Sequence, residues 1–218
     1  KFKLLADAFQ DEDKQDTLSY NASLSNDNPI PDWLSFNSNT LIFNGTPTNG
    51  HVGTMELKVT ATDNQNASVS ENFTLTVANV NDNPIITSSI KKDADEDAPY
   101  SYLFTAFDED VGDTLTLTAS RKPSWLNFDA STGILSGTPS NEDVGDHIVI
   151  MTASDTKNAI AQQTFAITVS NTNDTPQITS EPVTQATEGT QYVYKVTAFD
   201  PDVGHSIELA APFLPEWL

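Results

Sequence analysis

Acidic side chains gather where the alternating apolar segments of this sequence end. Asp108 and Asp110 close one such segment in an Asp-x-Asp-x-Gly step, and Asp155 closes another. Asp143 lies in a predicted turn, and Asp174 lies in a proline-terminated junction. Alternate residues of an extended segment point to the same side, so Asp108 and Asp110 can converge on one ion. These positions therefore indicate oxygen ligands for a hard cation.

Calcium is the cation that this ligand chemistry favours. It takes about six to eight oxygens and tolerates irregular geometry, whereas magnesium usually keeps several waters. The sequence has no cysteine and only His51, His147 and His205, which argues against thiolate zinc and copper sites. The competing interpretation is that the acidic residues only form solvated faces, as charge runs often do.

The composition excludes several classes of function. The 218 residues include 31 acidic and 10 basic side chains, a formal net charge of -21. Nucleic acids and anionic membrane surfaces both require a basic face, so neither is an expected partner. The longest apolar run, Ile148–Met151, is far too short to span a bilayer, so we expect no membrane insertion by this segment. The chain opens on Lys1-Phe2-Lys3 without a signal peptide, and we expect it to be an internal piece of a longer protein.

An internal repeat organises the whole chain. Pro31–Phe36 recurs as Pro123–Phe128 and begins again at Pro215–Leu218, which places the tryptophans 92 residues apart. Gly45-Thr46-Pro47 recurs as Gly137-Thr138-Pro139 at the same spacing. We expect this register to run without insertions. The repeat predicts three units: a first unit that lacks its opening strand (1–84), a complete second unit (85–176) and the start of a third (177–218).

The period within each unit is that of β-strands. Tyr100, Tyr102, Phe104 and Ala106 occupy every second position, and the denser segment 148–153 is predicted to be buried on both sides. About seven short strands in roughly 90 residues are typical of an immunoglobulin-like sandwich. We expect the tryptophan of each Pro-x-Trp-Leu segment to anchor the core between two sheets. The fold class is therefore all-β.

The chain resembles the dystroglycan-type cadherin-like domain, also described as a putative immunoglobulin domain of bacterial surface proteins. The motifs that carry the resemblance are P-x-W-L-x-F, G-T-P, V-G, T-A-[TS]-D and N-x-N-D-x-P, and they cover the whole chain. The resemblance implies tandem immunoglobulin/cadherin-like Greek-key β-sandwiches. It also implies that calcium binds between consecutive domains.

The resemblance implicates specific ligands at each joint. At the first joint they are Asn81, Asp82, Asn83, Asp108, Asp110 and Asp155. At the second joint they are Glu96, Asp143, Asn173, Asp174, Asp200 and Asp202. Asp11, Asp13 and Asp63 would face a unit before residue 1.

Three departures from the family pattern distinguish the joints. His51 stands 92 residues before Asp143, where the pattern has an acid, and Thr175 replaces Asn83 in the second joint. The early glutamate of the first unit would also precede residue 1. We therefore expect fewer or weaker ions at the first joint than at the second.

The function implied is a calcium-rigidified extender or adhesion segment of a large extracellular or cell-surface, membrane-associated protein. Its partners would be calcium ions, neighbouring repeats of the same chain, and cell-surface proteins or glycans. The alternative is a calcium-dependent carbohydrate-binding module, although the free aromatic residues Tyr20, Tyr192 and Phe213 are few and scattered. We expect no enzyme, since no Ser-His-Asp arrangement, phosphate loop or H-E-x-x-H motif occurs.

Overall fold

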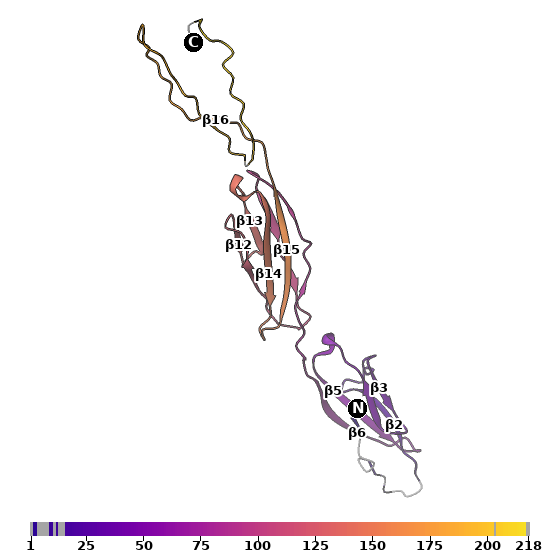
Figure 1. Ribbon diagram of the computed structural model, residues 1–218. Helices are drawn as coiled ribbons and strands as arrows, with labels where there is room; N and C mark the ends of the chain where they lie inside the picture. The colour runs from indigo at the N-terminus through magenta and orange to yellow at the C-terminus, as the bar shows by residue number, and fades with distance from the viewer. Residues whose placement is uncertain (1, 4–8, 11, 13–15, 203, 217–218) are drawn as a thin grey trace. The chain divides into compact units, whose positions relative to one another are not determined.

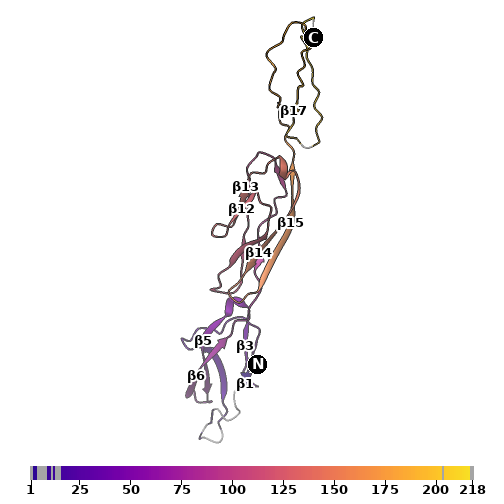
Figure 2. The ribbon, with the colours of Figure 1, turned by 60° about the vertical axis from the view of Figure 1, so that its left-hand side comes forward.

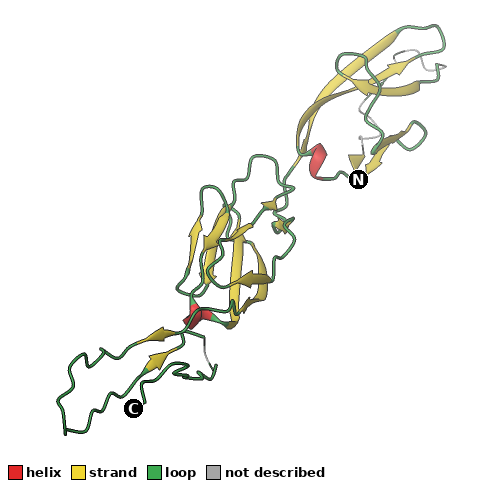
Figure 3. Cartoon of the chain, turned by 90° about the horizontal axis from the view of Figure 1, so that it is seen from above, coloured by secondary structure: helices red, strands yellow, loops and turns green. Residues whose placement is uncertain are grey.

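The computed structural model describes residues 2–3, 9–10, 12, 16–202 and 204–216. The described chain consists of strands and loops with two single-turn 3-10 helices, η1 (Asn49–His51) and η2 (Asn141–Asp143) (Figure 3). This confirms the all-β prediction. No helix in the described part has the length and apolar character needed to cross a bilayer. The chain divides into two compact units, residues 1–82 with 108–114 and residues 83–107 with 115–218.

The first unit is built from two antiparallel three-stranded sheets. Its buried core contains Leu34, Phe43, Leu57 and Val59. These residues alternate with less buried ones along their strands, so each sheet turns one face to the core. One sheet has the order β2 (Ser19–Leu24), β5 (Gly53–Thr62) and β6 (Ser68–Val77). The other has the order β1 (Phe2–Lys3), β4 (Ile42–Gly45) and β3 (Leu34–Asn37).

The second unit contains a complete sandwich (Figure 1). Its centre is formed by Phe104, Leu126, Leu135 and Ile167, none of which is exposed. One sheet has the order β11 (Thr116–Arg121), β14 (Gly145–Ser154), β15 (Ile160–Ser170) and β8 (Asp93–Asp95), and the other has β12 (Leu126–Asp129), β13 (Ile134–Gly137) and β9 (Tyr100–Leu103). Two short ladders pair β7 (Ile85–Ile86) with β10 (Ala106–Phe107), and β16 (Gln177–Ile178) with β17 (Ala198–Phe199).

The β14–β15 hairpin is the longest ladder of the second sandwich (Figure 2). Its burial corrects one prediction, because segment 148–153 is not buried on both sides. Val149, Met151 and Ala153 are fully buried, whereas Ile148 is 39% exposed. An antiparallel sheet can pack one face on a core and leave the other in water, which explains the alternation.

The Pro-x-Trp-Leu segments place leucine, not tryptophan, at the centre of each core. Leu126 is completely buried and Leu34 is 7% exposed, whereas Trp33 and Trp125 are partly buried and pack against the outside of the clusters. The Trp125 ring meets Tyr100 edge-on, with the ring centroids 5.8 Å apart. Neighbouring residues of an extended chain point to opposite sides, so only one of the pair can face the core. Trp217 lies outside the described residues.

A backbone contact explains the glycine of each Gly-Thr-Pro segment. A Cβ atom on Gly137 would lie 2.0 Å from the carbonyl oxygen of Trp125, and one on Gly45 would lie 2.1 Å from that of Trp33. Real side chains do not approach a backbone oxygen so closely. The glycine and the tryptophan segments therefore repeat together because their backbones touch.

The repeat register contains one insertion, so the prediction of an uninterrupted spacing was wrong. Thr62 and Ser154 are 92 residues apart, but their strand partners Ser19 and Thr116 are 97 apart. The extra residues lie between β2 and β3 of the first unit, in an exposed turn that includes Asp27. Surface loops accept such additions at small entropic cost.

Candidate metal centres

The first carboxylate group lies in the loop that follows β10. Asp108, Asp110 and Asp113 each bring one carboxylate oxygen within 4.8 Å of the others. The Asp110 amide donates to Asp108 Oδ1 at 2.9 Å, and the Asp113 amide donates to the Asp110 carbonyl at 3.2 Å. The structure thus brings together the two residues of the predicted Asp-x-Asp step. The prediction missed Asp113. The sequence pattern that could have revealed it is a third aspartate five positions after Asp108.

The junction segment reaches into this loop. The Asp82 amide donates to Asp110 Oδ2 at 2.9 Å, and Asn49 Nδ2 donates to Asp82 Oδ2 at 2.7 Å. Asp110 is only 4% exposed, yet its Oδ1 and the Oδ2 of Asp108 have no hydrogen-bond donor among the described residues. A buried carboxylate oxygen without a donor costs free energy. These carboxylate oxygens therefore fit as ligands of a hard cation.

A second group consists of Glu96, Asp97 and Asp174, whose ligand atoms also lie within 4.8 Å of one another. Glu96 is 2% exposed; its Oε2 accepts from the Thr172 amide at 3.3 Å. No described residue donates to its Oε1. The prediction missed Asp97, whose amide donates to the carbonyl of Pro139 and whose backbone is left-handed, with φ of 58°. This group also fits a hard cation.

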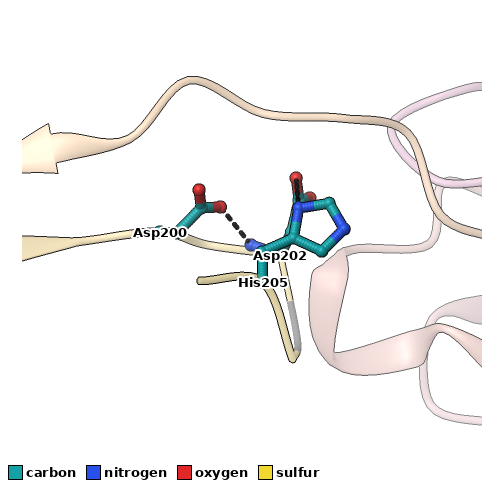
Figure 4. A group of neighbouring side chains, drawn as sticks. All are labelled: Asp200, Asp202 and His205. Carbon is teal, nitrogen blue, oxygen red and sulfur yellow. Dashed lines mark hydrogen bonds and ion pairs between the residues drawn. The ribbon is translucent and has the colours of Figure 1, made fainter. Parts of the chain in front are cut away.

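A third group combines two carboxylates with an imidazole. Asp200, Asp202 and His205 each offer a ligand atom within 4.8 Å of the others (Figure 4). The Asp202 amide donates to Asp200 Oδ1 at 3.0 Å, and His205 Nδ1 lies 3.1 Å from Asp202 Oδ2. The Asp174 amide donates to the same Oδ2 at 3.0 Å, so Asp174 links the second group to the third. His205 was not predicted as a ligand.

Asp143 has a capping role instead of a place in these groups. Its Oδ2 accepts from the Ser140 amide at 2.9 Å and from the Ser140 hydroxyl at 2.8 Å. In the first repeat, His51 Nδ1 accepts from the Thr48 amide at 3.0 Å. Each residue closes the capping box of its one-turn helix. The exchange of Asp143 for His51 therefore replaces one cap with another, and its effect on ion binding stays a prediction.

Asp155 and Asp63 both hold the tips of hairpins. Asp155, which is 6% exposed, accepts the amides of Lys157 and Ala159 at Oδ1, both at 2.8 Å. Asp63 accepts two amides at the same distances in the β5–β6 hairpin. Neither aspartate belongs to the three groups.

The remaining predicted ligands lie along the junctions or outside the described residues. Asn81 Nδ2 donates to the Asp82 carbonyl, and Asn173 Nδ2 donates to the Asp174 carbonyl, both at 3.0 Å. Asn83 is exposed. The predictions for Asp11 and Asp13 fall on residues that the structure does not describe.

Two stretches of the chain match one protein family. Residues 1–78 and 83–170 both fit the family model described as "Putative Ig domain". The chain belongs to this family. Its two matched Ig-family repeats carry the motifs from which the sandwich fold was predicted, although the narrower dystroglycan-type assignment is not part of this match.

Curated relatives of these Ig-family repeats are bacterial adhesins. The chain is 26% identical over 159 residues to the "Serine-rich adhesin for platelets" of Staphylococcus aureus strain MSSA476, which covers 73% of the chain. It is 27% identical over 156 residues to the protein of the same name from strain USA300. The chain spans only 7% of the length of these relatives.

Solved structures with the same fold include cadherin ectodomains. The crystal structure of human CDH23 EC21-23 matches with a TM-score of 0.58 and 22% identity, over 86% of this chain and 69% of that one. PcdhgB3 EC1-4 matches with a TM-score of 0.54 and 22% identity, over 86% of this chain and 50% of that one. The Ig-family repeats therefore have a cadherin-like sandwich fold.

Replacing Glu96 with glutamine tests the charge of the second group. In chelator, Glu96→Gln is expected to raise the thermal midpoint, because it removes a buried charge whose desolvation costs about 1–3 kcal/mol or more. Calcium should then raise the thermal midpoint of this variant by less than it raises that of the wild type. Differential scanning calorimetry in both buffers measures the two effects. Glu188→Gln is the matched control, since Glu188 is the exposed residue 92 positions later. Equal shifts in both variants would contradict the assignment.

Proposed function

We propose that this chain is a calcium-rigidified extender or adhesion segment of a larger extracellular or cell-surface protein. One observation carries the proposal: buried carboxylate oxygens without donors, Glu96 Oε1 and Asp110 Oδ1, lie beside the segments that join consecutive repeats. No residue that the structure describes donates a hydrogen bond to either oxygen. Calcium prefers such oxygens and accepts irregular ligand sets, which supports its choice over magnesium.

The proposed ligands follow the division into repeats 1–84, 85–176 and 177–218. The first joint would use Asn81, Asp82, Asn83, Asp108, Asp110 and Asp155, with Asp113 added. The second joint would use Glu96, Asp143, Asn173, Asp174, Asp200 and Asp202, with Asp97 added. Asp11, Asp13 and Asp63 would serve a preceding repeat.

Asp174 is the central residue of the proposed mechanism. Its carboxylate belongs to the group with Glu96 and Asp97, and its amide donates to Asp202. One junction residue thus contacts acidic residues that precede it and acidic residues that follow it. The positive charge that calcium supplies when bound offsets the repulsion between these carboxylates. Ligands drawn from both sides of a junction limit rotation about it.

The relatives support the proposed setting. The chain is similar in sequence to adhesins of Staphylococcus aureus, and it shares its sandwich fold with cadherin ectodomains. We assign the segment to the outside of the cell, with neighbouring repeats, cell-surface proteins or glycans as its partners. Within that family the motifs favour the dystroglycan-type branch. The role is structural and adhesive, not enzymatic.

Small-angle X-ray scattering tests the rigidity of the second joint. The wild-type chain is expected to have a larger and better-defined maximum dimension in calcium than in chelator, because bound ions restrict the junction. Asp174→Ala should reduce this difference, since it removes the shared ligand. Asp146→Ala is the matched control: this exposed aspartate lies on β14 and accepts a hydrogen bond from the Thr168 hydroxyl.

Identical scattering curves in calcium and chelator would contradict the proposal. So would a loss of the calcium response in Asp146→Ala as large as that in Asp174→Ala. Calorimetric titration of the same variants with calcium separates a loss of binding from a change in flexibility.

A further inference from the structure

The first sandwich contains an apolar pocket of about 290 Å³. Trp33 and Phe73 are among the side chains that line it. Their counterparts 92 residues later are Trp125, which packs against the buried core of the second sandwich, and Phe165, which belongs to that core. The same positions are therefore accessible in one sandwich and covered in the other.

One segment of the second repeat accounts for this difference. β8 brings Ala94 into the core with 7% of its surface exposed. Tyr100 follows at the start of β9, is 2% exposed, and meets the Trp125 ring edge-on. Among the described residues of the first repeat, no strand takes the place of β8, and β6 pairs on one side only, with β5. The pocket therefore lies beside an open strand edge.

The open edge of β6 corresponds to the edge that holds β8 in the second repeat. There, residues 168–170 of β15 pair with β8 in parallel, and the Thr168 amide donates to the Lys92 carbonyl at 2.8 Å. The counterparts of these three residues, 76–78, line the pocket. An exposed strand edge binds an extended peptide through backbone hydrogen bonds, and a neighbouring pocket selects its side chains. The first sandwich thus has both features of a strand acceptor.

The third repeat contains a segment with the shape of the one that fills the second core. Residues 183–192 lie 92 positions after that segment. The Tyr192 hydroxyl donates to the Val183 carbonyl at 2.6 Å, just as the Tyr100 hydroxyl donates to the Lys91 carbonyl at 2.7 Å. The segment is therefore already folded as an insert.

This insert is exposed and nearly uncharged. Ala186, the counterpart of the buried Ala94, is exposed, and no described strand pairs with its segment. The insert has one charged residue, Glu188, whereas the corresponding ten residues of the second repeat have six. Charges on an open strand normally prevent it from pairing with another chain. Two copies with a net charge of -21 also repel each other, so a segment with little charge is suited to a contact between them.

We propose that residues 183–192 of one copy of this chain insert into the pocket of the first sandwich of another copy, parallel to β6. Ala186 takes the position that Ala94 has in the second core, and Tyr192 covers Trp33 as Tyr100 covers Trp125. Each copy has one insert and one acceptor, so the contact is head-to-tail and can continue from copy to copy. This association goes beyond the proposed function and involves no ion.

Analytical ultracentrifugation of the full chain over a range of concentrations tests the proposal. The wild type is expected to form dimers and longer oligomers as its concentration rises. Ala186→Asp should weaken the association at least about tenfold, or about 1.4 kcal/mol, because it places a charge in an apolar pocket. Gln185→Asp is the matched control, since the exposed Asp93 occupies the equivalent position of the second repeat. Ala186 and Gln185 are both exposed in a single copy, so both variants should fold.

A synthetic peptide of residues 181–194 provides a second measurement. It should compete for the pocket and convert the oligomers to monomers, whereas the same peptide with Ala186→Asp should not. A wild-type chain that stays monomeric at every concentration overturns the proposal, as does equal association of Ala186→Asp and Gln185→Asp. Association that persists in chelator supports strand insertion even if the calcium titrations contradict the proposed function.

Discussion

Saturating calcium is expected to raise the thermal unfolding midpoint of the wild-type chain by several degrees over its value in chelator. A ligand present at about a hundred times its Kd stabilises the folded state by about 2.7 kcal/mol per site. That is a large share of the roughly 5–15 kcal/mol that holds an ordinary domain together. The rise should be largest for unfolding of the unit that contains Glu96 and Asp174. Their group includes Glu96, the acidic side chain with the smallest exposed fraction. Scanning calorimetry in calcium and in chelator measures it.

Two controls separate calcium binding from simple charge screening. Magnesium at the same concentration should give a smaller gain, because it keeps several waters and demands regular geometry. Sodium chloride at matched ionic strength should give less still, because it only screens the net charge of -21. Equal gains in all three salts would mean that the acidic residues form solvated faces.

Replacing Gly137 with alanine is expected to destabilise the second sandwich strongly. The added Cβ would lie 2.0 Å from the Trp125 carbonyl oxygen and 3.2 Å from the Leu126 Cα, so β12 and β13 would have to move apart. Overpacking of this kind typically costs about 1–3 kcal/mol, and backbone cannot yield as a flexible side chain does. Urea denaturation should show a lower midpoint.

Gly50→Ala provides the matched control for that prediction. No atom lies within 4 Å of the position where its Cβ would be built, and it sits in the one-turn helix η1. A surface substitution without a clash usually changes stability by less than about 0.5 kcal/mol. If Gly137→Ala and Gly50→Ala lowered the midpoint equally, the backbone contact would not be the reason for the glycine.

The parts of the candidate sites that could be predicted depend on local pattern. An Asp-x-Asp step at a strand end places both carboxylates on one side, and the structure brings together Asp108 with Asp110 and Asp200 with Asp202. Asp97 could not be found in this way. Its position depends on a left-handed turn and on a hydrogen bond to Pro139, which is more than forty residues away in the sequence.

The other differences between prediction and structure arise where one sequence pattern allows two structural roles. An aspartate in a turn can bind an ion or cap a helix, and only the contact with Ser140 shows that Asp143 caps. Pro-x-Trp-Leu offers two large apolar side chains, and only the direction of β12 decides that Leu126 enters the core. The alternation of the strands, in contrast, was enough to predict the sandwich.

The parallel pairing of β8 with β15 has a mechanical consequence for the second sandwich. Asp93 pairs with Thr168 and Asp95 with Ser170, so the strand near the start of this sandwich lies beside the one near its end, in the same direction. A pulling force on the two ends would load these backbone hydrogen bonds in shear, all at once. Antiparallel terminal strands would instead unzip one bond at a time. This pairing is suited to a protein segment that transmits tension.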